Sequence, residues 1–122
     1  MPYGGTFFGG LSTPDHGLLA YGLRGNVYRS TDAGRNWEKL DLGLPISVTG
    51  GTRLPDGSIV LVDEAGRVMR DGRNGGAFHT VAVDNPFSFT AAAVAADGSL
   101  VLAGARGIAR ITSNKLSDQP RP

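Results

Sequence analysis

Carboxylate pairs are the residues of this 122-residue chain that could catalyse hydrolysis. Glycoside hydrolysis needs two carboxyl groups held about 5 to 10 Å apart across the sugar. Asp63 and Glu64 are the adjacent acidic pair that falls near a predicted hairpin turn. Neighbouring residues of a strand point to opposite faces of the sheet, so we expect these two to form a poor catalytic dyad.

Histidines are the second source of candidate chemistry. His16 lies in the sequence DHG and is expected to be an exposed turn residue, while His79 is expected on an outer strand, exposed or partly packed. The chain contains no cysteine, no Gly-x-Ser-x-Gly elbow and no phosphate-binding loop. We therefore predict no catalytic residue, no metal site and no cofactor in this segment.

Composition excludes several other classes of protein. With 12 Lys and Arg against 11 Asp and Glu, the formal charge of +1 gives no reason to expect nucleic acid as a partner. No window approaches the roughly 20 apolar residues that cross a bilayer, so membrane insertion is not expected. The 40% of apolar residues can form a core, and the 19 glycines indicate many turns.

A repeat of 41 residues organises the chain. It is marked by three aspartates and three glycines, each set at that interval: Asp15, Asp56, Asp97, Gly25, Gly66 and Gly107. The segments DHGLLAYGLRG, DGSIVLVDEAG and DGSLVLAGARG align without gaps. Repeats of this length are typical of propeller blades.

Each repeat contains short apolar runs separated by glycine turns, which predicts antiparallel strands. The alanine-rich run at 91–96 is predicted to be a strand because of its register with the other repeats. Four strands in about 40 residues indicate an all-β fold, a partial β-propeller of about three four-stranded blades with the last incomplete. A sandwich or a barrel would not require the sequence to repeat at a fixed interval of 41 residues. We place the blades at about 7–42, 48–83 and 89–112, followed by a polar tail at 113–122.

The sequence STDAGRNW at 30–37 is the most specific motif. Ser30, Asp32, Gly34 and Trp37 fit the pattern Ser-x-Asp-x-Gly-x-x-Trp, and the motif resembles the Asp-box, or BNR repeat, of sialidase-like propellers. A short carboxylate can accept backbone N–H groups across its own turn, and glycine permits the left-handed residue. We expect these four residues to form a structural turn and not a catalytic site.

The phrase GLRGNVYRSTDAGRNW most resembles the photosystem II assembly-factor-like branch of Asp-box propellers. That resemblance implies a non-enzymatic scaffold that binds other proteins, commonly after export to a periplasm or lumen. The alternative is a fragment of a sialidase- or xyloglucanase-like hydrolase with its catalytic residues elsewhere. Sialidases carry a characteristic Arg-Ile-Pro, and this tripeptide is absent here.

Arginines recur at equivalent positions of the repeat. Arg24 and Arg106 share one hairpin position, and Arg29 and Arg70 share a position on the third strand. Such a set could form a positive patch for acidic segments of a partner protein. The alternative is that they are solvated charges that discourage sheet pairing.

Three blades are too few to close a ring, because propellers have at least four. The sequence therefore resembles the C-terminal three blades of a longer propeller, with the strand that closes the ring outside it. Uncovered blade faces and open sheet edges favour pairing with other chains. We therefore expect the isolated chain to self-associate or to be marginally stable.

Overall fold

The computed structural model describes residues 5–14, 16–72, 75–113 and 116. The secondary structure elements of this part of the chain are eleven strands and one short 3-10 turn, η1 (Leu23–Gly25). Three antiparallel sheets contain all the strands. Blade 1 consists of β1 (Phe7–Thr13), β2 (Gly17–Gly22), β3 (Val27–Ser30) and β4 (Glu38–Leu40). Blade 2 consists of β5 (Val48–Arg53), β6 (Ile59–Asp63), β7 (Val68–Gly72) and β8 (Gly75–Val81). Blade 3 consists of β9 (Phe89–Val94), β10 (Leu100–Gly104) and β11 (Gly107–Ile111).

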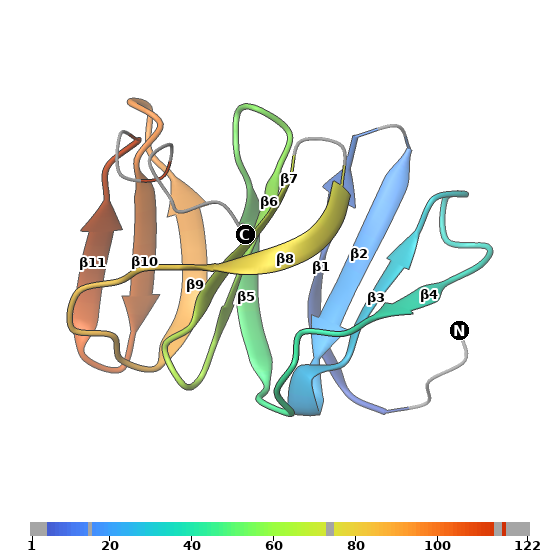
Figure 1. Cartoon of the computed structure of the whole chain (residues 1–122), viewed down its shortest axis with the longest axis horizontal. Coiled ribbons are helices and arrows are strands. Elements are labelled where there is room, and N and C mark those ends of the chain that lie inside the picture. The colour runs from blue at the N-terminus through green and yellow to red at the C-terminus, as the bar shows by residue number, and fades with distance from the viewer. Residues whose placement is uncertain (1–4, 15, 73–74, 114–115, 117–122) are drawn as a thin grey trace.

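The three sheets stand side by side, with blade 2 between the other two (Figure 1). The first strand of each blade contacts the first strand of the next, so that β5 packs against both β1 and β9. This arrangement confirms the predicted fold class, a partial β-propeller whose third blade has three strands. It also confirms that the alanine-rich run begins within a strand, β9.

The 41-residue repeat is visible in the backbone. Each first strand carries a register irregularity at the same point: between Phe7 and Gly9, between Val48 and Gly50, and between Phe89 and Ala91. One hydrogen bond also recurs in all three blades, from the hairpin after the second strand to the residue before the first strand. It joins Leu23 N to Thr6 O, Glu64 N to Ser47 O, and Ala105 N to Ser88 O, at 3.1, 3.2 and 3.3 Å.

Two apolar cores fill the spaces between neighbouring blades. Leu19, Val27, Leu61 and Met69 belong to the core shared by blades 1 and 2. The core shared by blades 2 and 3 is built largely from Val60, Val62, Val68, Val81, Phe89, Leu100, Leu102 and Ile111. All five residues of β6 are buried, because this strand faces a neighbour on both sides.

The third blade departs from the register of the other two. Leu19 pairs with Arg29 and Val60 with Arg70, but Val101, the next equivalent residue, pairs with Arg110 and not with Ile111. A shift of one residue exchanges the two faces of a strand. Ile111 is therefore buried, while Ile108 is 76% exposed.

The hairpin turns account for this shift. Asn26 and Arg67 end the four-residue turns of blades 1 and 2, where their side chains bond to Leu23 O and to the Asp63 carboxylate. The equivalent residue of blade 3 is Ile108, which has no polar group to hold such a turn and which favours strand. Consequently β11 begins two residues earlier in the repeat than β3 and β7, and only Ala105 and Arg106 remain between the paired Gly104 and Gly107.

Candidate functional site

The motif at 30–37 folds as a closed turn between β3 and β4. Ser30 Oγ donates to Asp32 Oδ1 at 2.8 Å and accepts the Gly34 N–H at 2.8 Å. Asp32 accepts the backbone N–H of Asn36 at 2.8 Å and its side-chain amide at 2.7 Å. Trp37 Nε1 donates to Gly34 O at 2.9 Å and closes the turn. Ala33 and Gly34 both have positive φ, 62° and 92°.

The carboxylate of Asp32 is an acceptor on both oxygens. Hydrogen bonds from the Asn36 backbone, the Asn36 side chain and Ser30 lower the pKa of Asp32 from 3.8 to about 2. A general acid at neutral pH requires the opposite shift. The geometry therefore suits Asp32 for holding the turn, and it gives the aspartate no proton to transfer.

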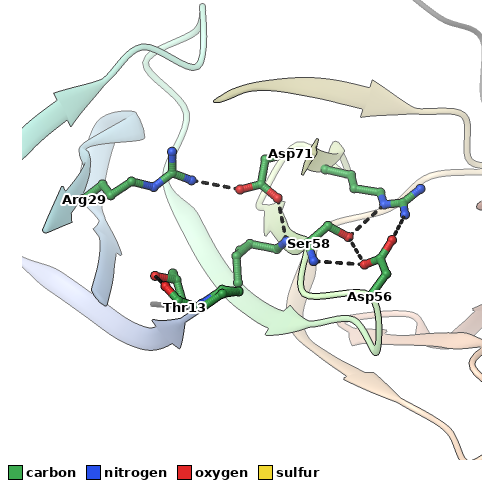
Figure 2. Close-up of polar contacts among 8 residues, drawn as sticks. Thr13, Arg29, Asp56, Ser58 and Asp71 are labelled. Carbon is green, nitrogen blue, oxygen red and sulfur yellow. Dashed lines mark hydrogen bonds and ion pairs between the residues drawn. The ribbon is translucent and has the colours of Figure 1, made fainter. Parts of the chain in front are cut away.

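Blade 2 carries Asp71 where blade 1 carries Ser30, and this aspartate joins two blades. Asp71 Oδ1 accepts the N–H of Ile59 at 2.6 Å, and Oδ2 lies 2.8 Å from Arg29 Nη2 of blade 1 (Figure 2). The Asp71 side chain is 3% exposed. Burial raises its pKa, although the Ile59 N–H and the Arg29 charge act against this effect.

Arg70 is bound on the other side of blade 2. Its guanidinium lies 2.7 Å from Asp56 Oδ2, 3.1 Å from Ser58 Oγ and 3.0 Å from Leu116 O. Burial opposes ionisation of Asp56, but hydrogen bonds from Ser58 and the charge of Arg70 outweigh it and lower the pKa. Figure 2 places Asp56 and Ser58 on one side of this network and Arg29 on the other.

The four predicted partner-binding arginines divide into two pairs. Arg29 and Arg70 are half-buried and engaged in bonds within the molecule. Arg24 lies in η1 and Arg106 in the β10–β11 turn, and both are exposed. These turns lie at the same end of the blades, which we call the hairpin end, while Arg70 reaches Asp56 in the β5–β6 turn at the opposite end. The structure therefore does not gather all four into one patch.

The other candidate residues are separated or enclosed. Asp63 is fully buried, accepts the N–H groups of Ala65 and Arg67, and lies 2.6 Å from Arg67 Nε. Glu64 is exposed, as are His16 in the β1–β2 turn and His79 on β8. Asp15, which marks the repeat in the sequence, lies outside the described residues. Within 5–14, 16–72, 75–113 and 116 there is no group of three His, Asp or Glu residues able to hold a metal ion.

Sequence reasoning missed two features of this region. The hydroxyl residues Thr6, Ser47 and Ser88 recur at the repeat interval, and their carbonyls accept the hydrogen bond common to all three blades. Leu116, in the predicted polar tail at 113–122, is 4% exposed and packs into the core between blades 2 and 3. The repeat interval could have revealed the first feature, but a single leucine in a polar segment gives no signal for the second.

In the described part of the chain, no helix has the length and apolar character to cross a membrane. No protein-family model matches the sequence, and no curated protein matches it at a significant level.

Two solved structures that resemble this chain are β-propellers. YCF48 bound to a D1 peptide superimposes with a TM-score of 0.78 at 19% identity, over 94% of this chain and 40% of YCF48. A catalytically inactive virginiamycin B lyase from Staphylococcus aureus, with quinupristin, superimposes with a TM-score of 0.78 at 19% identity. The match covers 94% of this chain and 41% of the lyase. The chain thus spans about two-fifths of either propeller. At this identity the likeness shows the fold alone.

Proposed function

We propose that the chain is a non-catalytic propeller module that binds other proteins, an Asp-box scaffold similar to photosystem II assembly factors. The observation that carries the proposal is the pair of exposed arginines at the hairpin end, Arg24 and Arg106. No hydrogen bond or ion pair joins either guanidinium to another described residue. Exposed guanidinium groups suit recognition of carboxylates on a partner.

Two further observations support this proposal. YCF48, a propeller of similar backbone, binds a D1 peptide, so this architecture can accept a protein ligand. The motif at 30–37 has the closed, fully bonded geometry expected of a structural Asp-box. Its four defining residues hold one another, which leaves partner binding to other parts of the surface.

A carbohydrate-active propeller is the second candidate. The virginiamycin B lyase shows that enzymes also use this architecture. In this chain the carboxylate of Asp63 is enclosed by Arg67 and backbone N–H groups, which makes it unsuitable for catalysis. A hydrolase would therefore need an acid and a nucleophile from outside these residues.

The test compares two double variants in capture of proteins from the source cells at low salt. Arg24→Ala with Arg106→Ala removes the arginines of the hairpin end. Arg35→Ala with Arg53→Ala is the matched control, because these exposed arginines lie outside the hairpin end. We expect the first variant to lose proteins that the wild type and the control retain. Equal capture by all three would contradict the arginine site, and hydrolysis of sialosides or xyloglucan by the wild type would contradict the non-catalytic assignment.

A further inference from the structure

Three exposed charged side chains lie along the hairpin end, one on each blade. Arg24 lies in η1, Glu64 directly follows β6, and Arg106 lies in the β10–β11 turn. The three turns follow one another in blade order along the lower edge of Figure 1. Within the part of the chain that the structure describes, no hydrogen bond or ion pair joins the Glu64 carboxylate to another residue. The charges are therefore positive, negative and positive in blade order, and the proposed function uses only the two positive ones.

Backbone hydrogen bonds fix the places of these three side chains. Ser47, which is 6% exposed, accepts one N–H group from each of the first two turns. Its Oγ accepts the Arg24 N–H and its carbonyl accepts the Glu64 N–H, each at 3.2 Å. In blade 3 the equivalent carbonyl bond holds Ala105, the residue before Arg106. The order of the charges is thus set by the stacking of the blades.

The packing of the blades also sets the spacing of these charges. Apolar cores fill the spaces between neighbouring blades, so the sheets pack face to face. Facing sheets lie about 10 Å apart, and an extended chain advances about 3.3 Å per residue. Successive charges of the hairpin end therefore match side chains about three residues apart in an extended peptide. The two arginines match carboxylates about six residues apart.

Apolar surface accompanies the first of these charges. Leu23, beside Arg24 in η1, is 36% exposed, and Leu44 in the loop between β4 and β5 is 49% exposed. A side chain at Gly25 would meet the Leu44 carbonyl, which places Leu44 beside η1. An apolar residue next to a carboxylate of the partner would cover this surface and remove it from water.

We propose that the hairpin end binds an extended segment of another protein in which an acidic, a basic and an acidic residue follow at intervals of three, with an apolar residue beside the acid that meets Arg24. This inference rests on the proposed function, because it uses the same two arginines, and it adds a basic residue opposite Glu64. Opposite charges across an interface favour binding, and like charges are costly. Glu64 therefore selects against segments that are acidic throughout.

Other occupants fit this end less well. The exposed acids Glu64 and Asp41 oppose an anionic membrane surface, which attracts clusters of basic residues. A second copy would have to supply the same pattern of charges, which occurs in this sequence at Asp32, Arg35 and Glu38. That segment is folded into the closed turn, where hydrogen bonds hold the Asp32 carboxylate, so it is not extended. A different protein chain is the better occupant.

The test follows the backbone amides of the isotope-labelled full chain by NMR while synthetic peptides are added. The probe LETSKTSEL carries the predicted charges, which read the same in both directions. LETSETSEL places an acid opposite Glu64, and LKESTTSEL has the composition of the probe with the basic residue moved away from the centre. We expect LETSKTSEL to shift the amides of η1 and of the β6–β7 and β10–β11 turns. It should bind about two- to tenfold more tightly than either control, the range for one exposed charge pair made attractive or repulsive.

Variants of Glu64 make the test specific for the central charge. Glu64→Lys should reverse the preference between LETSKTSEL and LETSETSEL. Glu64→Gln should abolish the preference, and it serves alone if Glu64→Lys does not fold. An unchanged preference in these variants would overturn the inference. So would the absence of hairpin-end shifts at about 1 mM peptide, where weak complexes are still seen. Shifts caused by phosphatidylserine vesicles or by dimerisation, without a response to LETSKTSEL, would also overturn it.

The double variant Arg24→Ala with Arg106→Ala separates this inference from the proposed function. We expect it to lose most of the binding of all three peptides. Binding that needs the arginines but shows no preference at Glu64 would overturn the inference and leave the proposed function in place. Binding that persists in the double variant would contradict the arginine site, and the inference with it.

Discussion

Arg29 of blade 1 and Asp71 of blade 2 form an ion pair across the space between the blades, with Nη2 and Oδ2 2.8 Å apart. The side chains are 18% and 3% exposed. Asp71 also accepts the Ile59 N–H of its own blade, so one carboxylate fixes the second and third strands of blade 2 and anchors blade 1 to them. The aspartate takes the place in the repeat that Ser30 occupies in the first blade.

Removing the Asp71 carboxylate should therefore weaken the contact between blades. We expect Asp71→Ala to lower the free energy of unfolding by about 3 kcal/mol, because it leaves Arg29 and the Ile59 N–H without their acceptor. Asp71→Asn keeps an oxygen for Ile59 and should cost less. Urea unfolding measures both. Equal, small effects would show that the pair contributes little.

The turn at 30–37 should make stability depend on pH in the acid range. The folded-state pKa of Asp32, about 2, lies below the ordinary value of 3.8. The stabilisation by its carboxylate is therefore complete above pH 3.8 and is lost as the pH falls toward 2. Asp32→Asn should remove this part of the pH dependence. Thermal unfolding followed by Trp37 fluorescence between pH 2 and 5 measures this pH dependence. If the melting temperature changed equally with pH in the wild type and in Asp32→Asn, the stabilising role of the Asp32 carboxylate would be contradicted.

Close contact of the first strands should make Gly50 intolerant of a side chain. A Cβ at Gly50 would lie 2.9 Å from Ala91 Cα and 3.0 Å from Thr90 O, and backbone atoms cannot move aside easily. We expect Gly50→Ala to destabilise by about 1 to 3 kcal/mol. Gly43→Ala is the control, since Gly43 has φ of 86° but open space around it, so only backbone strain of about 1 kcal/mol applies. A smaller effect at Gly50 than at Gly43 in chemical unfolding would argue against this packing.

The burial of Leu116 predicts that the C-terminal segment contributes to stability. Leu116→Ala should cost about 2 to 4 kcal/mol, because it removes a side chain that is 4% exposed from the core between blades 2 and 3. Leu44, which is 49% exposed, provides the matched control, and Leu44→Ala should have little effect. Calorimetry compares the melting temperatures of the two variants. Equal melting temperatures would show that Leu116 does not contribute to the core.

Much of the fold could be predicted from the sequence because each copy of the sequence repeat folds into one sheet of the structure. The apolar run at 59–62 must be covered on both faces, and only neighbouring blades at a fixed interval supply that cover. The closed turn at 30–37 could be predicted too, since its hydrogen bonds join residues at most four positions apart.

Features that depend on distant contacts could not be predicted in this way. The register of β11 changes because Ile108 replaces the polar residues that hold the equivalent turns, a difference that a gap-free alignment conceals. The separation of Arg29 and Arg70 from the exposed arginines depends on Asp71 and Asp56. Sequence equivalence placed these arginines in one set, but their partners in space divide them.

The most direct test of the propeller arrangement is proton–proton contact between the first strands of neighbouring blades. In a nuclear Overhauser spectrum of the full chain, the α-protons of Gly50 should show cross-peaks to Ala91, because a Cβ at Gly50 would lie 2.9 Å from Ala91 Cα. Blades packed side by side predict these cross-peaks. Their absence, or cross-peaks from Gly50 to Ile108 on the outward face of β11 instead, would contradict the propeller arrangement.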